Sequence, residues 1–285
     1  MPELPEVEII KNNLSEYMIG NKFISIEVNT SKLRYKIPHN FDETIKNSKV
    51  IKIERIAKYI IIYLSNEFKI LVHLGMTGNF LSSSQKINSL INNEDKHVHL
   101  RFFMTNDVII NYHDIRKFGF FKIISPDNLV LENLKNNLGI DALSNKFNTK
   151  YLINKLTTRT GNIKTSLLNQ SIVAGIGNIY ASEALYRARI SPLTISKNLA
   201  KDEKKITKLI SAIKYILDDA IKVGGSTIKN HKNIKGESGY FQYKFNVYNR
   251  EKMKCKRVNC NSLISRINQS GRSTFYCKSC QSETQ

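Results

Sequence analysis

Four cysteines near the C-terminus form the clearest candidate site for chemistry. Cys255 and Cys260 are separated by four residues, Cys277 and Cys280 by two, and sixteen residues lie between the pairs. Two close pairs joined by an insert of hairpin length are typical of a tetrahedral zinc site. Because four thiolates would complete the coordination, we expect one structural Zn²⁺ that holds the intervening hairpin. Four independent reduced cysteines would not explain the pairing.

A second candidate lies at the other end of the chain, where Pro2 follows Met1. A small residue after the initiator methionine normally permits its removal, which here would expose a secondary amine. An α-amino group titrates at about pH 8, so much of it is neutral and able to form an iminium, as in Schiff-base lyases. Glu3 and Glu6 supply carboxylates for acid–base steps. Proline and acids are also ordinary at a helix start, so this pattern alone leaves a purely structural role open.

Two further clusters occur in the first half of the chain. The segment 73–78 places Met76 at a turn bounded by glycines, and the segment 112–119 places a cationic pair beside Phe118. Apolar side chains on turns next to arginine suit a protein that fills the gap left by a base rotated out of a duplex. Taken singly, each cluster also fits core packing with a solvated basic flank.

The charge of the chain favours a polyanionic partner. Lys and Arg number 44 against 24 acidic residues, which gives a formal net charge of +20. An A/T-rich genome would also raise the lysine content. However, only Glu237 and Glu251 oppose the basic residues of segment 222–280, and aromatic residues are interleaved with them. Such a segment is expected to fold and to contact phosphates, so nucleic acid is the favoured partner.

No pattern in the sequence indicates a membrane protein or an exported one. The apolar runs are far shorter than the roughly eighteen residues of a membrane span. The N-terminus, with Glu3, Glu6 and Glu8, lacks the basic and apolar regions of a signal peptide. We therefore expect a cytoplasmic protein, and a reducing compartment favours a metal site over disulfides for the clustered cysteines.

The elements that must position these residues differ between the two halves of the chain. An N-terminal helix is expected from Pro5 until Gly20 stops it. Residues 22–125 show short β-branched and aromatic runs typical of a β-sandwich or barrel. The expected strands are 23–28, 50–56, 59–64, 70–74, 97–104, 108–112 and 118–124. The polar segment 82–96 is expected to form a surface loop.

After Pro126 the periodicity becomes helical. The expected helices are 129–138, 150–156, 163–169, 179–188 and 202–223. The glycine-rich segment 173–178 predicts a tight turn whose following helix offers free backbone N–H groups to an anion. From residue 239 to the cysteines the chain is expected to be strand-like again.

Together these segments resemble the formamidopyrimidine-DNA glycosylase family, whose start, Met-Pro-Glu-Leu-Pro-Glu-Val-Glu, is identical to residues 1–8. The likeness continues in order through 57–59, 73–78, 116–119, 175–183, 224–227, 239–241, 247–248, 271–275 and the cysteines. It implies an α+β fold: an N-terminal helix plus β-sandwich, a helix-two-turn-helix domain and a C-terminal β-hairpin zinc ribbon. The expected domains are 1–125, 126–245 and 246–285.

The resemblance implies a bifunctional DNA glycosylase and abasic-site lyase of base excision repair, acting as a monomer at the nucleoid. Its substrate would be double-stranded DNA that contains 8-oxoguanine or formamidopyrimidines. Pro2 would be the Schiff-base nucleophile at C1′ of the sugar, and Glu3 the general acid for opening the deoxyribose. Lys58 would contact phosphates and donate a proton in β-elimination. Arg272 would hold the phosphates beside the lesion and assist δ-elimination.

Further residues match the DNA-binding positions of the family. Met76, Arg116 and Phe118 resemble the triad that fills the space after base eversion, with Arg116 reading the orphaned cytosine. The segment Gly225–Tyr240 corresponds to the loop that covers the flipped base. The implied phosphate contacts are His97, Arg159, Lys164 and Asn178.

Some positions depart from the family pattern. The spacing of Cys255 and Cys260 exceeds the usual two intervening residues, although zinc still fits it. The segment 139–143 lacks the prolines that are common there, which puts the interdomain linker geometry in doubt. Arg159 replaces a frequent lysine and keeps the charge. His99 lies two residues from His97, so either histidine could meet the phosphate.

Two alternatives stay open at this point. An endonuclease-VIII-like glycosylase for oxidised pyrimidines would share Pro2, Glu3, Lys58 and the zinc hairpin, but that group usually has glycine where this chain has Leu4. A non-catalytic zinc-ribbon DNA-binding protein would have no need to retain all three catalytic residues.

Overall fold

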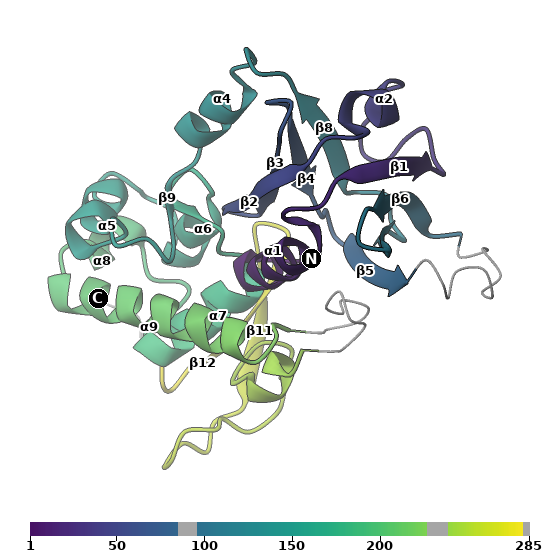
Figure 1. The fold of residues 1–285 in the computed structure, drawn as a ribbon. Helices are drawn as coiled ribbons and strands as arrows, with labels where there is room; N and C mark the ends of the chain where they lie inside the picture. Colours follow the sequence, from purple (N-terminus) through teal and green to yellow (C-terminus); the bar gives the residue numbers. More distant parts are fainter. Residues whose placement is uncertain (85–95, 227–238, 282–285) are drawn as a thin grey trace. The chain divides into compact units, whose positions relative to one another are not determined.

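The computed structural model describes residues 1–84, 96–226 and 239–281 (Figure 1). The chain forms two compact units, of which the first comprises Met1–Asn133 with Val223–Tyr240 and the second Leu134–Lys222 with Phe241–Gln285. The cysteine-bearing segment shares the second unit with the helices. The domain boundaries expected at residues 125 and 245 stay a prediction.

Helix α1, Leu4–Met18, opens the first unit. Its start is fixed by a capping box between Glu3 and Glu6, in which each side chain accepts a hydrogen bond from the backbone of the other. The apolar side chains of its core-facing stripe recur at helical spacing and are buried. The chain leaves the helix at Gly20, whose φ of +87° favours glycine. The sequence prediction of this helix is confirmed.

Two four-stranded antiparallel sheets form most of the first unit, with orders β2-β3-β4-β8 and β1-β6-β7-β5. The strands are β1 (Phe23–Val28), β2 (Val50–Ile56), β3 (Tyr59–Leu64), β4 (Lys69–His73), β5 (Asn79–Ser84), β6 (Val98–Met104), β7 (Val108–His113) and β8 (Phe120–Ile124). A short helix, α2 (Phe41–Ile45), follows β1.

The inner faces of both sheets and the apolar side of α1 share one buried core. Aromatic rings from different strands meet edge to face within it: Tyr112 and Phe121 have ring centroids 4.7 Å apart at 84°, and Phe80 lies 6.1 Å from Phe121. This packing of two sheets against each other confirms the predicted β-sandwich and the α+β class.

The second unit is mainly helical. Helix α4 (Val130–Asn137) crosses the boundary between the units. The helices that follow are α5 (Thr149–Leu156), α6 (Ile163–Leu168), α7 (Asn178–Ala188), α8 (Ser196–Leu199) and α9 (Glu203–Lys222). A two-stranded parallel pair joins β9 (Ile140–Asp141) to β10 (Val173–Ala174). The long helix α9 packs against α7 and buries an apolar stripe of eight residues.

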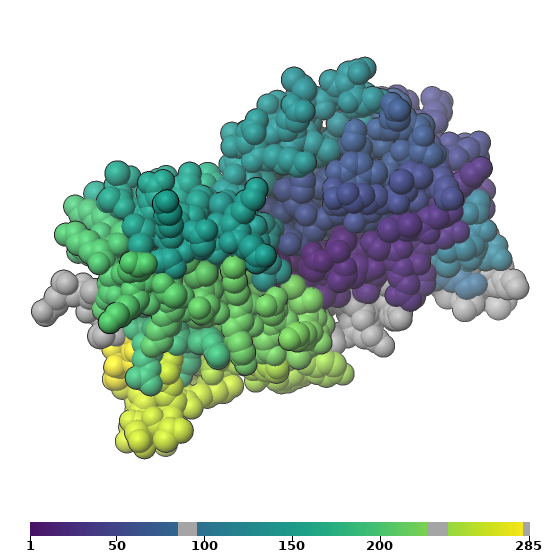
Figure 2. Space-filling model, turned by 60° about the vertical axis from the view of Figure 1, so that its left-hand side comes forward, coloured from purple at the N-terminus to yellow at the C-terminus, as the bar shows by residue number. Residues whose placement is uncertain are grey.

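The C-terminal hairpin completes the second unit. Strands β11 (Ile264–Gln269) and β12 (Arg272–Cys277) pair antiparallel, and the turn Ser270–Gly271 has positive φ at both residues. Strand β12 packs on α7. In the space-filling view of Figure 2, the yellow atoms of the C-terminal segment lie against green atoms of the same unit. The expected hairpin is therefore present, and it is attached to the helices through a small apolar core.

The structure corrects two expectations. The predicted loop at 82–96 does not begin at Ser82, because Ser82–Ser84 continue strand β5 against β7; residues 85–95 of that prediction lie outside the described part. The segment from 239 to the cysteines is not strand-like: its described residues form a 3₁₀ helix, Phe241–Lys244, and turns. Phe241 packs against Tyr180 of helix α7 rather than in a sheet, whereas Tyr243 is exposed. Helix α8 and the β9–β10 pair were not expected.

Among the helices of the described residues, none has the combination of length and apolar composition that crossing a membrane requires.

Candidate functional site

The start of α1 buries the two residues at the N-terminus that are predicted to be catalytic. Pro2 and Glu3 are buried, and the backbone N–H of Glu3 donates to Oε2 of Glu6 at 2.9 Å. The Glu3 carboxylate accepts the backbone N–H of Glu6 in return. The capping box thus sets the position of the chain end and places a carboxylate one residue after Pro2.

Glu6 also anchors the beginning of the segment that follows α9. Its Oε1 accepts both the backbone N–H and the hydroxyl of Ser226, each at 2.9 Å. A Cβ added to Gly225, which has a φ of +76°, would lie 3.2 Å from the same oxygen. Glu6 therefore serves as a structural anchor. Residues 227–238 of the expected covering loop lie outside the described residues.

Lys58 occupies a buried turn of the first unit. It lies between strands β2 and β3 and is 8% exposed. On β4, which pairs with β3, the ring of His73 stacks on Phe120 at 5.6 Å and 12°. Burial, followed by the charges of Lys58 and Arg34, lowers the pKa of His73 to about 4. The His73 imidazole is therefore neutral at neutral pH, close to the positive charges of Lys58 and Arg34.

A buried carboxylate organises the two turns that carry the predicted triad of Met76, Arg116 and Phe118. Asp114 is 0% exposed; its Oδ1 accepts the Thr77 hydroxyl at 2.5 Å and the Arg116 N–H at 3.3 Å. Its Oδ2 accepts the N–H of Gly119 at 2.7 Å and the Tyr112 hydroxyl at 3.3 Å. Burial and then the Asp114 charge raise the pKa of Tyr112, so this hydroxyl remains a donor.

The triad itself is presented outward from these turns. Met76 is 38% and Phe118 45% exposed, and the Arg116 guanidinium lies 4.7 Å from the centroid of the Phe118 ring. The two turns touch backbone to backbone, because a Cβ added to Gly75 would lie 2.3 Å from the carbonyl carbon of Phe118. Exposed apolar side chains on rigidly joined turns suit insertion into a stack of bases.

The two histidines of β6 and its preceding residue differ in accessibility. His99 is 2% exposed, and its Nε2 lies 2.9 Å from the backbone oxygen of Asp114. His97 is half-buried, and its backbone carbonyl accepts the N–H of Asp114 at 3.1 Å. Of the pair, His97 is the one whose side chain can be reached from outside.

In the second unit, the predicted residues of α6 and α7 meet the hairpin. Asn178, the first residue of α7, donates from Nδ2 to the Ser273 carbonyl at 2.9 Å. The ammonium of Lys164, which is 1% exposed, contacts Asn178 Oδ1 at 2.6 Å, Thr274 Oγ1 at 2.5 Å and the Ser273 carbonyl at 3.3 Å. These bonds fix the strand that begins at Arg272.

The remaining predicted cations of this unit are exposed. Arg272 is exposed at the first position of β12, directly after the Ser270–Gly271 turn. Arg159 is exposed beyond the end of α5, and its backbone carbonyl accepts the N–H of Lys197 at 3.0 Å. The structure therefore brings Lys164, Asn178 and the base of the Arg272 strand together.

The four cysteines gather into one group, as their spacing predicts. Their Sγ atoms all lie within 4.8 Å of one another, with Cys255 and Cys280 3.9 Å apart and Cys260 and Cys277 3.6 Å apart. A tetrahedral ion with bonds of about 2.3 Å to sulfur needs sulfur–sulfur distances of about 3.8 Å. A backbone hydrogen bond from Ser262, with the other thiols, lowers the pKa of Cys260 to about 7. The group fits a metal ion.

Sequence reasoning assigned no role to three buried or nearly buried charged groups. Asp114 lies within segment 112–119, but nothing in the sequence shows that four donors converge on it. Glu183, 2% exposed on α7, accepts the backbone N–H groups of Asn246, Val247 and Tyr248. Arg55 joins two elements that lie 47 residues apart in sequence. In the sequence, each of these residues is visible only as a charged residue within an apolar pattern. Its role becomes clear only when its hydrogen-bond partners are known.

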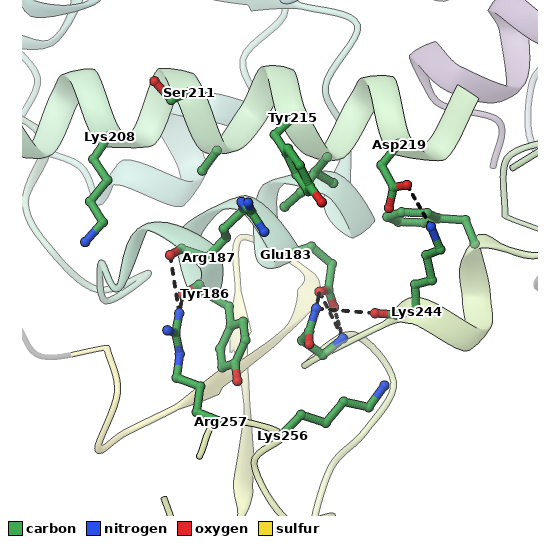
Figure 3. Close-up of a pocket in the computed structure, with 14 residues that line it drawn as sticks. Glu183, Tyr186, Arg187, Lys208, Ser211, Tyr215, Asp219, Lys244, Lys256 and Arg257 are labelled. Atoms are coloured by element: carbon green, nitrogen blue, oxygen red, sulfur yellow. Dashed lines mark hydrogen bonds and ion pairs between the residues drawn. The ribbon is translucent and has the colours of Figure 1, made fainter. Parts of the chain in front are cut away.

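A pocket in the second unit lies away from these residues. It encloses about 830 Å³ between the end of α7, the middle of α9 and the first cysteine pair (Figure 3). Arg257 donates to the Tyr186 carbonyl at 2.6 Å, and the Arg187 guanidinium lies 3.6 Å from the Tyr215 ring centroid. These contacts cap α7 and join it to α9. The predicted site residues lie outside the lining, so we assign the chemistry elsewhere.

Comparison with known proteins identifies the family. The sequence model of the formamidopyrimidine-DNA glycosylase N-terminal domain matches residues 1–121, and that of the H2TH domain of the same enzyme matches residues 138–232. The chain is 41% identical over 281 residues to the formamidopyrimidine-DNA glycosylase of a Wolbachia species from Brugia malayi, covering 99% of this chain and 100% of that one. It is 42% identical over 281 residues to the Zymomonas mobilis protein of the same name, with 99% and 100% coverage.

Solved structures agree. The Lactococcus lactis enzyme in complex with abasic-site DNA has a TM-score of 0.87 and 33% identity to this chain, covering 99% of this chain and 100% of that one. A complex of the same enzyme, in a mutant form, with DNA containing a formamidopyrimidine lesion has a TM-score of 0.88 with the same identity and coverage. The chain belongs to the formamidopyrimidine-DNA glycosylase family.

Proposed function

We propose that this protein excises 8-oxoguanine and formamidopyrimidines from double-stranded DNA and then cleaves the strand at the resulting abasic site. Relatives over the whole length of the chain carry the glycosylase name, and solved relatives bind DNA with abasic or formamidopyrimidine sites. The observation in this chain that carries the proposal is the Pro2–Glu3 pair, buried and fixed by the capping box at the start of α1.

Removal of Met1 frees the nitrogen of Pro2 as a secondary amine. Its lone pair attacks C1′ of the damaged nucleotide, the N-glycosidic bond breaks, and the base leaves with the bonding electrons and takes up a proton. Glu3 protonates the sugar oxygen as the ring opens, and the amine loses its proton. The product is an iminium between Pro2 and C1′.

Strand cleavage follows from this iminium. Loss of a proton from C2′ allows the C3′–O bond to break, and Lys58 supplies a proton in this β-elimination. Arg272 holds the flanking phosphates and assists the second elimination, in which the C5′–O bond breaks. Water then hydrolyses the iminium and restores the free amine of Pro2.

The remaining residues bind the DNA. Met76, Arg116 and Phe118 fill the space left by the everted base, which offsets an unstacking cost of a few kcal/mol. His97, Arg159 and Asn178 contact phosphates. Lys164 supports them from inside the unit, since its ammonium is engaged by Asn178 and the hairpin.

The clustered thiols hold one structural Zn²⁺, whose four sulfur ligands leave no open position for catalysis. Cys255, Cys260, Cys277 and Cys280 would be those ligands. An enzyme that repairs chromosomal DNA works where that DNA lies, so we place the protein in the cytoplasm at the nucleoid.

The decisive experiment combines borohydride trapping with a strand-cleavage assay. Met1-processed protein is mixed with a duplex bearing 8-oxoguanine opposite cytosine, with and without sodium borohydride. We expect a covalent adduct that disappears when the N-terminal amine is acetylated. Glu3→Gln should lose excision of the base but still form an adduct on a duplex with a preformed abasic site. A mobility shift of the duplex in a native gel, without any adduct or cleavage, would instead identify a non-catalytic DNA-binding protein.

One observation favours a second substrate class. The Lactococcus lactis enzyme has also been solved with DNA that contains an oxidised pyrimidine. A duplex with an oxidised pyrimidine therefore belongs in the same assay. Cleavage of that duplex alone would assign the chain to pyrimidine repair.

A further inference from the structure

The proposed lyase step uses groups from two different elements of the first unit. Pro2 and Glu3 immediately precede α1, whereas Lys58 lies in the two-residue turn between β2 and β3. The amine forms the iminium and the ammonium donates the proton, so the two must be aligned closely. The start of α1 must therefore be held in a fixed position relative to that turn.

The side chain of Arg55 connects these two elements directly. Its Nε donates to Oε2 of Glu8 on α1 at 2.6 Å, and its Nη1 donates to the carbonyl oxygen of Ala57 at 2.9 Å. The Arg55 side chain is 9% exposed and that of Glu8 is 21% exposed. A planar guanidinium that makes two bonds at this depth fixes orientation in a way that an exposed ion pair does not.

The carbonyl that Arg55 holds belongs to the peptide bond whose nitrogen is that of Lys58. Ala57 has a φ of +54°, in the left-handed region that residues with a Cβ rarely adopt. Since Lys58 is 8% exposed, packing restricts its side chain, and the position of the ammonium follows the backbone of the turn. By holding the Ala57 carbonyl, Arg55 thus helps to fix the position of the Lys58 ammonium.

Glu8 is fixed from its own helix as well. Lys11, one turn further along α1, contacts Glu8 Oε1 at 2.7 Å. Burial raises the pKa of Glu8, but the hydrogen bonds and charges of Lys11 and Arg55 outweigh it, and the pKa is lowered. The carboxylate that receives Arg55 is therefore ionised at neutral pH.

We propose that Arg55 and Glu8 are positioning residues that align Lys58 with the N-terminal amine for strand cleavage. The inference rests on the proposed function and adds two residues to its machinery. Neither touches the reacting atoms; each acts through Lys58 or through the placement of α1.

The test compares Arg55→Gln with Lys52→Gln. Both remove one positive charge from β2, but the Lys52 side chain is 59% exposed, so the pair controls for loss of nonspecific DNA attraction. On a duplex with a preformed abasic site, the borohydride adduct reports iminium formation and single-turnover cleavage reports elimination. We expect Arg55→Gln to slow cleavage by about tenfold to a hundredfold, because the Lys58 ammonium is then misplaced. The adduct yield of Arg55→Gln should stay within about twofold of that of Lys52→Gln.

Glu8→Gln tests the other side of the pair. It should slow cleavage selectively in the same way, and the double variant should be little slower than the slower single variant, because both changes break one contact. Cleavage by Arg55→Gln at the rate of Lys52→Gln would overturn the inference. So would an equal loss of adduct and cleavage together with a lower unfolding temperature, which indicates a merely structural role. Absence of an adduct with the unaltered protein would instead refute the proposed function.

Discussion

Replacement of Asp114 by Asn provides the sharpest test of how the turns carrying the triad are held. In the structure, the two carboxylate oxygens accept four hydrogen bonds, two from hydroxyl groups and two from backbone N–H groups. Hydroxyl groups can rotate to accept from the new amide, but a backbone N–H cannot. The Arg116 N–H has a second acceptor in Thr77 Oγ1 at 3.0 Å, whereas the Gly119 N–H depends on Asp114 at 2.7 Å.

The expected loss in the free energy of unfolding follows from this difference between the two N–H groups. Asn keeps its one oxygen on Gly119 and loses the charge-assisted bonds on the other side, which lowers the free energy of unfolding by about 1.5–3 kcal/mol. For a unit of this size, each kcal/mol lowers the unfolding temperature by about 2–4 °C, so a decrease of about 3–12 °C is expected. Base eversion should slow as well, because the triad is presented from less rigid turns.

Thermal unfolding measures the first effect, and stopped-flow fluorescence of 2-aminopurine beside the lesion measures the second. Asp107→Asn is the matched control, because it makes the same substitution at an exposed turn with a φ of +60°, which Asn accepts readily. The reasoning is refuted if Asp114→Asn unfolds within about 1 °C of this control, the range of an ordinary surface change.

Three further outcomes are expected. Gly75→Ala should separate the two turns by pushing a Cβ against Phe118 and should lower the unfolding temperature and the eversion rate, whereas Gly161→Ala, with open space around it, should change neither. Because burial and two neighbouring cations lower the pKa of His73 from 6.5 to about 4, the unfolded state takes up the proton first. Stability should therefore be lost as the pH falls from 6.5 towards 4, and His73→Gln should weaken that dependence in thermal scans at several pH values; an unchanged slope would contradict it. Metal analysis should find one zinc ion per chain, and its removal by a chelator should abolish duplex binding in a gel-shift assay while the sandwich still unfolds cooperatively; retained binding would show that the ribbon does not need the metal.

The sequence predicts the regular elements of this protein well where local patterns determine them. Strands β1, β2 and β3 have the bounds expected from their β-branched runs, and α1 follows from Pro5 at its start and Gly20 at its end. Strand β5 extends into Ser82–Ser84 because β7 supplies the hydrogen-bond partners, a long-range pairing that the polar composition conceals. The aromatic run after residue 239 suggested strands, but Glu183 accepts the backbone N–H groups of residues 246–248, and Phe241 packs on Tyr180 of helix α7.

For the candidate site, the types of residue were predictable but their surroundings were not. The gathering of the cysteines follows from their spacing alone. The resemblance placed Lys164 among the phosphate contacts, yet its ammonium is buried among acceptors from α7 and the hairpin. Nothing local distinguishes such a lysine from an exposed one. The choice between His97 and His99 likewise depends on which side chain the sandwich core receives.

The bond between Glu6 and Ser226 has a consequence for the order in which the protein is made. The two residues are 220 positions apart, and the first unit recruits its last piece from beyond the helices of the second. At about 5–20 residues per second, the ribosome needs roughly 11–44 s to travel from one residue to the other. During that time the N-terminal segment with Glu6 has already been made, whereas Ser226, which anchors beside it, does not yet exist. The first unit therefore cannot be completed until synthesis has passed through the helices of the second.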